Sequence, residues 1–314
     1  MKKPLVILTG PTAVGKTALS IRLAKAIGGE IISADSMQVY KGMDIGSAKI
    51  SHEEMDGVCH HLIDILSPEE EFNVMIFQQK CKEAMERIYK AGHIPILTGG
   101  TGFYIQAVLY DIDFSKEEES GIRSRLEEIS KQKDGPRILH EMLQKVDPKS
   151  AEAIHLNNVK RVIRAIEFYE LTGTRISDHN EEEKQKEAAY NSAYFVLNDE
   201  RELLYRRIDQ RVDEMFANGL VEEVSRLKDF GYHRQMVSMQ GLGYKEVLDY
   251  LDGHISLEEA IYLIKRDTRH FAKRQLTWFR REKDVVWVDM PKFQYQEDLI
   301  LNYMLDVLKE RGII

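Results

Sequence analysis

The octapeptide GPTAVGKT, at residues 10–17, stands between an apolar stretch, PLVIL, and a segment with helical periodicity, KTALSIRLAKAI. It matches the pattern G-x-x-x-x-G-K-[ST] at every position. In that pattern a strand leads into a glycine-rich turn whose backbone N–H groups surround a phosphate at the start of a helix. The octapeptide therefore predicts an α/β chain whose first strand is buried in a parallel sheet.

The same loop predicts phosphate binding without identifying the compound that carries the phosphate. Lys16 would place its charge on the terminal phosphate, and the Thr17 hydroxyl is suited to hold Mg²⁺. Kinases and nucleotide hydrolases usually carry a second acidic strand end, but the strand in HIPILTGGTG ends without a carboxylate. The ligand could thus be a nucleotide or another diphosphate, bound by Gly10, Pro11, Thr12, Ala13, Val14, Gly15, Lys16 and Thr17.

Strand-like and helical segments alternate in the first third of the chain, and the pattern changes in the middle. The strand-like runs PLVILTG, EIISADS and HIPILTGGTG each end in polar residues. In a parallel sheet, ligands bind beyond such carboxyl ends. Residues 114–190 are rich in Glu, Lys and Arg and contain only helical patterns. We therefore expect a helical insertion domain at 114–190 within a core of residues 1–113 and 191–314.

The composition favours a protein of the cytoplasm without a general affinity for nucleic acid. The formal net charge is −8, so any nucleic-acid surface must be a local basic patch. Two cysteines are too few for a disulfide framework and fit a reducing compartment. The N-terminal apolar run is too short for a signal peptide, and no apolar run is long enough to cross a membrane.

Asp35 is the one acidic residue at a strand end near the phosphate loop. Its carboxylate could hold Mg²⁺ or accept a proton from a nucleophile, although Asp is also a common helix N-cap. The amide of Gln38 suits an adenine edge. The pocket of the nucleophile could be lined by Ser36, Met37, Gln38 and Tyr40. In the glycine-rich turn after the third strand, the hydroxyls of Thr98 and Thr101 or the backbone could contact phosphate or substrate, or the segment could be a simple glycine turn.

The segment CHHLIDI places Cys59, His60 and His61 side by side. In an extended segment at most alternate side chains point the same way. No second ligand pair with metal-binding spacing is evident. We expect a structural or substrate-lining role here in preference to zinc binding.

The helical segment KRDTRHFAKRQLTWFRR carries basic side chains at three- and four-residue steps beside Trp278 and Phe279. Such a stripe suits phosphate contacts and base stacking, although it could also be a solvated helix face. A second basic cluster lies in the expected insertion, and two patches favour a structured RNA as partner. The stripe consists of Arg266, Arg269, His270, Lys273, Arg280 and Arg281. The cluster in the insertion consists of Lys160, Arg161 and Arg164.

Seven motifs, read together, resemble the tRNA dimethylallyltransferases (tRNA isopentenyltransferases, the IPP transferase family) over nearly the whole chain. The resemblance implies a P-loop NTPase-like parallel sheet core with a helical insertion, in the compact bacterial form, because no Cys/His zinc finger follows DVVWVDM. It also implies transfer of a dimethylallyl group from dimethylallyl diphosphate to N6 of adenine 37, beside the anticodon of a tRNA, with Mg²⁺ as cofactor and a monomeric protein. Whether ATP also binds the loop stays open. The motifs are GPTAVGKT, ISADSMQVYKGMDIGSAK, HHLIDI, PILTGGTGFY, RVIRAIE, GLGYKE and KRQLTWFRR.

The resemblance also implies roles for individual residues. Asp35 would be the general base toward the adenine amine, and Lys16, Thr101 and Arg211 would complete the catalytic set, with Arg211 as a clamp on the diphosphate. The residues expected to contact tRNA are Asp35, Ser36, Met37, Gln38, Thr101, Arg123, Lys160, Arg161, Arg164, Gln240, Gly243, Lys245, Lys273, Arg274, Gln275 and Arg280.

Two other classes of protein carry a similar loop. A P-loop small-molecule kinase would bind ATP but would leave the C-terminal basic stripe unexplained. A GTPase-like RNA-binding module would carry the guanine-reading string N-K-x-D, which does not occur in the chain. We rank both below the transferase.

Overall fold

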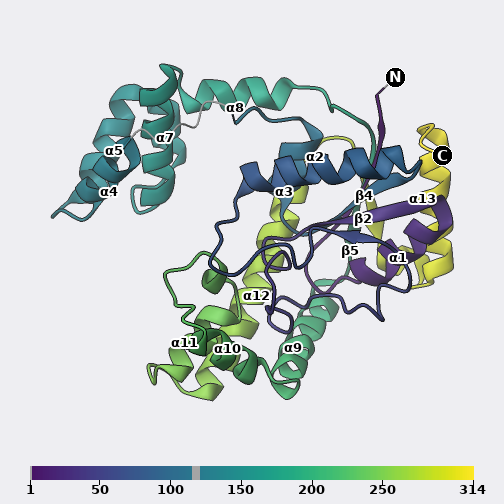
Figure 1. Ribbon diagram of the computed structural model, residues 1–314. Coiled ribbons are helices and arrows are strands. Elements are labelled where there is room, and N and C mark those ends of the chain that lie inside the picture. The colour runs from purple at the N-terminus through teal and green to yellow at the C-terminus, as the bar shows by residue number, and fades with distance from the viewer. Residues whose placement is uncertain (1, 115–120) are drawn as a thin grey trace. The chain divides into compact units, whose positions relative to one another are not determined.

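The computed structural model describes residues 2–114 and 121–314, shown in Figure 1. The chain divides into two compact units, one made of the residues up to Leu109 and from Ala189 to Ile314, the other of Tyr110–Ala188. The insertion expected at 114–190 overlaps the second unit at residue 114 and over residues 121–188. Residues 115–120 of the expected insertion lie outside the described part of the chain. No helix of the described residues has the length and apolar character needed to cross a membrane.

The first unit contains a six-stranded sheet in which every strand pair is parallel, with strand order β3-β2-β4-β1-β5-β6. The predicted α/β class with a parallel sheet is therefore confirmed. Helix α1 follows the first strand, α2 precedes β4, and α3 follows β4. The elements are β1 (Pro4–Thr9), α1 (Lys16–Ile27), β2 (Gly29–Ala34), β3 (His60–His61), α2 (Val74–Lys90), β4 (Ile94–Gly99), α3 (Gly102–Leu109), β5 (Asn191–Asn198) and β6 (Val285–Asp289).

Strand β1 is apolar throughout because both faces of the sheet are covered. Residues 5–8 are completely buried, as is usual for the central strands of a parallel sheet. Val6 and Leu8 join a core cluster that also includes Leu23 of α1 and Met304 of the C-terminal helix α13. The phosphate loop is thus built on the most deeply buried strand of the unit.

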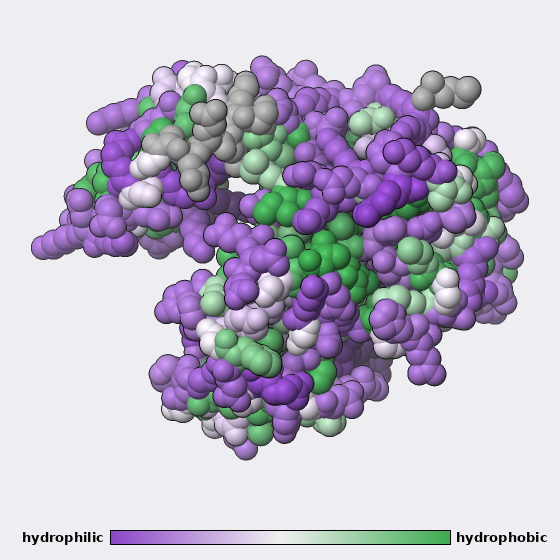
Figure 2. All heavy atoms as spheres, viewed as in Figure 1, coloured by the Kyte–Doolittle hydropathy of each residue, from purple (hydrophilic) through white to green (hydrophobic). Residues whose placement is uncertain are grey.

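The C-terminal half of the first unit is mainly helical. The long helix α12 packs on α9, α11 and α3, so it connects the other C-terminal helices with the helix that follows β4. Figure 2 shows a mostly hydrophilic surface with an apolar area near the middle of this unit. The elements are α9 (Arg201–Ala217), α10 (Leu220–Asp229), η1 (Ser238–Gln240), α11 (Tyr244–Leu251), α12 (Leu257–Phe279), η2 (Met290–Phe293) and α13 (Glu297–Glu310).

The second unit is helical and has its own apolar core, formed by residues that include Leu126, Leu143 and Val162. The buried Asp147 caps α6 by accepting from the backbone N–H of Ser150 at 3.1 Å, and also accepts from the N–H of Ser177 at 2.9 Å. The described helices are α4 (Ile122–Ser130), α5 (Gly135–Val146), α6 (Pro148–Ala153), α7 (Val159–Thr172) and α8 (Ile176–Gln185).

Candidate active site

Three loops meet at the carboxyl edge of the sheet because β1, β4 and β2 are neighbours in register. Gly99 is opposite both Thr9 of β1 and Ala34 of β2. The Thr9 hydroxyl donates to the Gly99 carbonyl at 2.5 Å, and the Thr101 N–H donates to the Ala34 carbonyl at 3.3 Å. The Thr98 hydroxyl is buried here without a hydrogen-bond partner among the described residues.

The phosphate loop has the backbone that its glycines require. Gly10 and Gly15 have φ of +147° and +99°, and helix α1 starts at Lys16 with no acidic side chain in its first turn and no side-chain cap. Its first N–H groups are thus left for an anion. The hydroxyl of Thr17, in the same turn, has no hydrogen-bond partner in the described part of the chain.

Lys16 is held over this loop. Its ammonium donates to the carbonyls of Pro11 at 2.8 Å and Gly10 at 3.1 Å. Burial, assisted by the charge of Arg211, lowers the pKa of Lys16 to about 7, while Asp35 acts in the opposite direction. The lysine of the unliganded loop is thus ready to gain a proton when an anion binds.

Asp35 lies one residue beyond β2 and caps a turn, not the helix N-terminus that the sequence left as an alternative. One carboxylate oxygen accepts from the N–H groups of Met37 at 2.7 Å and Gln38 at 3.2 Å. Burial raises the pKa of Asp35, although these two N–H groups and the charge of Lys16 oppose the rise. The other oxygen has no hydrogen-bond partner among the described residues. The arrangement orients the carboxylate and leaves one oxygen for chemistry.

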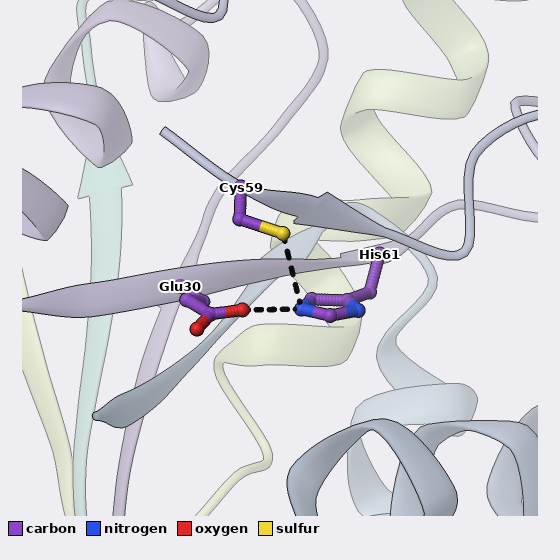
Figure 3. A group of neighbouring side chains, drawn as sticks. All are labelled: Glu30, Cys59 and His61. Carbon is purple, nitrogen blue, oxygen red and sulfur yellow. Dashed lines mark hydrogen bonds and ion pairs between the residues drawn. The ribbon is translucent and has the colours of Figure 1, made fainter. Parts of the chain in front are cut away.

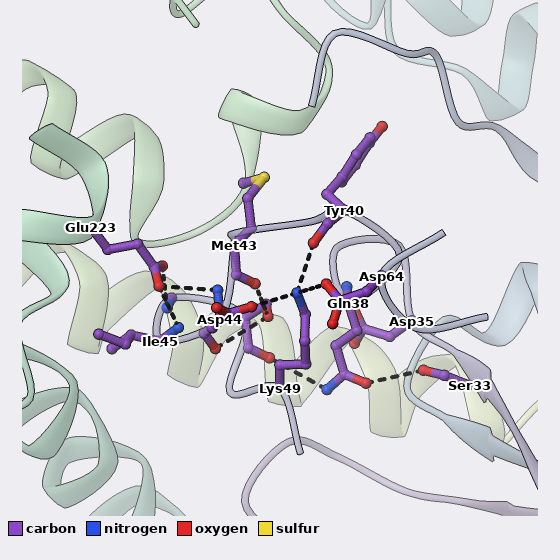
Figure 4. A network of polar contacts seen from close by, with 12 residues as sticks. Ser33, Asp35, Gln38, Tyr40, Met43, Asp44, Ile45, Lys49, Asp64 and Glu223 are labelled. Carbon is purple, nitrogen blue, oxygen red and sulfur yellow. Dashed lines mark hydrogen bonds and ion pairs between the residues drawn. The ribbon is translucent and has the colours of Figure 1, made fainter. Parts of the chain in front are cut away.

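The segment that follows Asp35 is fastened by polar contacts drawn in Figure 4. The Gln38 amide accepts from the Ser33 hydroxyl at 3.0 Å and donates to the carbonyls of Ser47 and Ala48 at 3.4 and 3.3 Å. Gln38 is therefore engaged within the protein, in contrast to the adenine contact suggested by the sequence.

Two further residues hold the same segment and were missed by the sequence analysis. The buried ammonium of Lys49 donates to the Tyr40 carbonyl at 2.7 Å and pairs with Asp64. Glu223 of α10 accepts from three consecutive backbone N–H groups, of residues 44–46, at 2.8 to 3.1 Å, and from the Tyr244 hydroxyl at 2.8 Å. Glu223 had no sequence signal because it lies in an ordinary amphipathic helix.

Helix α12 fixes the position of the two glycine-containing loops. The Gln275 amide accepts from the Thr12 N–H at 2.9 Å and donates to the Gly100 carbonyl at 3.0 Å. A Cβ on Gly100 would lie 2.1 Å from the Gln275 amide nitrogen, and one on Gly102 would lie 2.2 Å from the Trp278 ring. The glycines thus allow α12 to approach. Gln275, expected to contact tRNA, is buried and instead bridges the two loops.

The basic stripe on α12 is shorter than the sequence indicated. Arg269 is paired with Asp209 of α9, and Arg266 with Asp267 at 2.8 Å. Four exposed basic side chains in the C-terminal part form no ion pair with any described residue, so the free positive charge gathers at that end. These are Lys273, Arg274, Arg280 and Arg281.

The other predicted RNA contacts occupy several places. Arg123 pairs with Glu167 at 2.6 Å, and Arg164 lies 3.6 Å from the same carboxylate, while Lys160 and Arg161 are exposed on α7. In the first unit Met37 packs against Gly241, Gly243 is buried at the start of α11, and Lys245 lies 3.4 Å from Glu246. Ser36 and Thr101 are half-buried; Arg211 and Gln240 are exposed.

The chain is similar to known proteins over most of its length. The model of the family described as IPP transferase matches residues 38–282. A tRNA dimethylallyltransferase of Lachnoclostridium phytofermentans is 60% identical over 99% of both chains. One of Carboxydothermus hydrogenoformans is 52% identical over 93% of this chain and 94% of the relative.

Two solved structures are similar over most of the chain. The full-length tRNA isopentenylpyrophosphate transferase of Bacillus halodurans aligns with a TM-score of 0.74 and 46% identity, covering 99% of this chain and 98% of its own. A eukaryotic dimethylallyltransferase described as acting on tRNA aligns with a TM-score of 0.80 and 32% identity, over 91% of this chain and 74% of its own.

Proposed function

This chain belongs to the IPP transferase family, and we propose that it transfers a dimethylallyl group from dimethylallyl diphosphate to N6 of adenine 37 beside a tRNA anticodon. The observation that carries the proposal is the pairing of Asp35 with the phosphate loop. A partly buried carboxylate with one unengaged oxygen is coupled to the loop lysine, Lys16. This proximity supports the proposal that a proton acceptor lies beside a diphosphate site.

The reaction needs this pairing because the adenine amine is a weak nucleophile, its lone pair being delocalised into the ring. As N6 forms a bond to C1 of the dimethylallyl group, the bond from C1 to the diphosphate oxygen breaks. Asp35 accepts the proton that N6 loses. Lys16, the loop N–H groups and Arg211 stabilise the charge that develops on the leaving diphosphate, and positioning of the two substrates lowers the barrier further.

Mg²⁺ fits the donors at the start of α1. The Thr17 hydroxyl is exposed in the first helical turn and is a hard oxygen ligand of the kind that Mg²⁺ prefers. When bound, Mg²⁺ would supply additional charge stabilisation for the diphosphate. Thr17 is the one protein ligand that we assign to it.

The RNA would reach the site along the free basic end of α12. Lys273, Arg274 and Arg280 are exposed and suited to phosphate contacts. The target base must leave its stack to meet the donor, and Met37 and Thr101 are expected to border it. Lys160 and Arg161 of the insertion would add phosphate contacts. We propose that one chain suffices, because it supplies every one of these groups.

The proposal is tested by mass spectrometry of an unmodified anticodon stem-loop that contains A36-A37-A38. The stem-loop is incubated with the protein, Mg²⁺ and dimethylallyl diphosphate. We expect a gain of one five-carbon prenyl unit on A37, and no gain with Asp35→Ala. Consumption of ATP without prenyl transfer would instead support the small-molecule kinase.

A further inference from the structure

Three side chains from two neighbouring strands converge at the amino end of the sheet, as Figure 3 shows. Glu30 is the second residue of β2, and Cys59 and His61 lie at the edge strand β3. The His61 Nε2 atom is 2.6 Å from a Glu30 carboxylate oxygen and 3.5 Å from the Cys59 sulfur. One ligand atom of each of the three residues lies within 4.8 Å of the other two.

The cluster is spatially separate from the proposed active site. Asp35 follows β2 at its carboxyl end, whereas Glu30 lies near the amino end of the same strand. A third segment reaches the cluster at the start of β4, where His93 Nδ1 is 2.5 Å from the other Glu30 oxygen. Four metal-ligating side chains are therefore gathered at an edge that the transfer reaction does not use.

We propose that Glu30, Cys59 and His61 form a binding site for a divalent transition-metal ion of the zinc class. A thiolate, an imidazole and a carboxylate are the ligand types that Zn²⁺ takes, usually in a tetrahedron. Water would complete the tetrahedron at the exposed side. His93 would orient the carboxylate through its second oxygen, as outer-shell partners of metal ligands commonly do.

The distances suit a tetrahedral ion with a small movement of one side chain. Zinc bonds of about 2.3 Å to sulfur and about 2.05 Å to nitrogen place those two atoms roughly 3.5 Å apart. The Cys59 sulfur and His61 nitrogen are 3.5 Å apart. The nitrogen and the Glu30 oxygen, now 2.6 Å apart, would separate to roughly 3.4 Å.

The backbone explains why these side chains face one another. Cys59 and His61 are two residues apart in an extended segment, so they point to the same side. Their neighbour His60 is turned away and its Nδ1 atom lies 2.9 Å from the Val58 carbonyl. In β3, His60 is opposite Ile31 and His61 is opposite Ile32. The ion would join this short edge strand to β2, which it otherwise meets over two residues.

Cobalt substitution tests the site directly. Tag-free protein is treated with a chelator, dialysed and titrated with Co²⁺, and Zn²⁺ is then added in competition. We expect one equivalent of Co²⁺ to give tetrahedral visible bands and a sulfur-to-cobalt charge-transfer band, both abolished by Zn²⁺. Cys59→Ser should remove the charge-transfer band and weaken Zn²⁺ binding at least about tenfold. His93→Ala should retain the band and weaken binding by about 10- to 100-fold.

Two variants serve as matched controls. His60→Ala removes the adjacent histidine that faces away, and Cys81→Ala removes the other cysteine, which is buried in α2; both should keep the charge-transfer band. A spectrum without that band, or equal Zn²⁺ affinity in wild type and Cys59→Ser, would overturn the proposal. Prenyl transfer by the Cys59→Ser variant is measured alongside, and we expect it to be unchanged.

Discussion

A carboxylate lies near each end of strand β2, Glu30 at the amino end and Asp35 just beyond the carboxyl end. Their surroundings shift the two pKa values in opposite directions. Burial acts to raise the pKa of both Asp35 and Glu30. At Glu30, hydrogen bonds from His93, His61 and Cys59 outweigh burial, so its pKa is lowered. At Asp35, two backbone N–H groups and the charge of Lys16 do not outweigh burial, so its pKa is raised.

The contrast agrees with the different roles that we propose for the two carboxylates. A carboxylate with a raised pKa is a better proton acceptor, and raised values are found at catalytic sites. A carboxylate with a lowered pKa stays ionised and is available as a ligand. On the two proposals, partners from neighbouring segments would distinguish a base at the carboxyl edge from a metal ligand at the amino edge.

Replacement of Asp35 tests the contrast most strongly. Asp35→Asn keeps the size of the side chain but cannot accept the proton, so we expect the single-turnover rate of transfer to fall by about 10²- to 10⁴-fold. Affinity for the stem-loop should change little. The matched variant at the other end, Glu30→Gln, should retain transfer within about threefold. Equal losses in the two variants would remove the functional distinction between the ends of β2.

The protonation of Lys16 gives a second test of the carboxyl edge. The pKa of about 7 lies below the ordinary value of 10.5, so at pH 8.5 the lysine of the unliganded protein is mostly neutral. A bound diphosphate favours the charged form, and binding should therefore take up close to one proton at pH 8.5 and almost none from this group at pH 6. Calorimetry in buffers of different ionisation enthalpy measures the uptake. Lys16→Met should abolish it and bind the donor more weakly.

Local patterns were sufficient to predict the strands and the loop of the carboxyl edge. The glycine spacing of residues 10–17 predicts the phosphate loop, and Asp35 follows the apolar residues of a predicted strand. The rule that at most alternate side chains of Cys59, His60 and His61 point the same way also agrees with the structure. In each instance the deciding contacts are between near neighbours in the chain.

Contacts between distant segments account for what the sequence did not reveal. Glu30 is 31 residues from His61, and His93 is 63 residues from Glu30, so the sequence, from which we did not expect a zinc site, could not show that these side chains meet. Glu223 contacts Asp44 across 179 residues. Gln275 was expected to contact tRNA because of the family resemblance, but it is buried and bonded to the two loops. Such polar pairings have no periodicity that a sequence could display.

Gln275 tests a second difference between the two ends of the sheet. At the carboxyl edge this side chain of helix α12 bridges two loops, whereas the contacts of the amino-end cluster come from the strand segments themselves. Gln275→Leu would leave the Thr12 N–H and the Gly100 carbonyl without partners. At about 1 kcal/mol for each hydrogen bond, we expect transfer to fall by about 10- to 30-fold, with weaker donor binding. Gln79→Leu, an exposed glutamine of α2, is the control. A normal donor KM and rate in Gln275→Leu would show that the bridge is dispensable.

The smallest expected effect concerns the edge from which we propose that RNA approaches. Lys273→Ala removes one exposed charge near the carboxyl edge, so stem-loop affinity should fall only a few-fold. The slope of log K against log salt should become shallower by about 0.7 to 0.9, the contribution of one phosphate contact. Lys90→Ala removes an exposed lysine from the end of α2, just before β4 and therefore at the amino edge. Its salt slope should equal that of the wild type. Identical slopes for all three proteins would mean that α12 is a solvated face, and equal changes in both variants would mean that RNA does not distinguish the two edges.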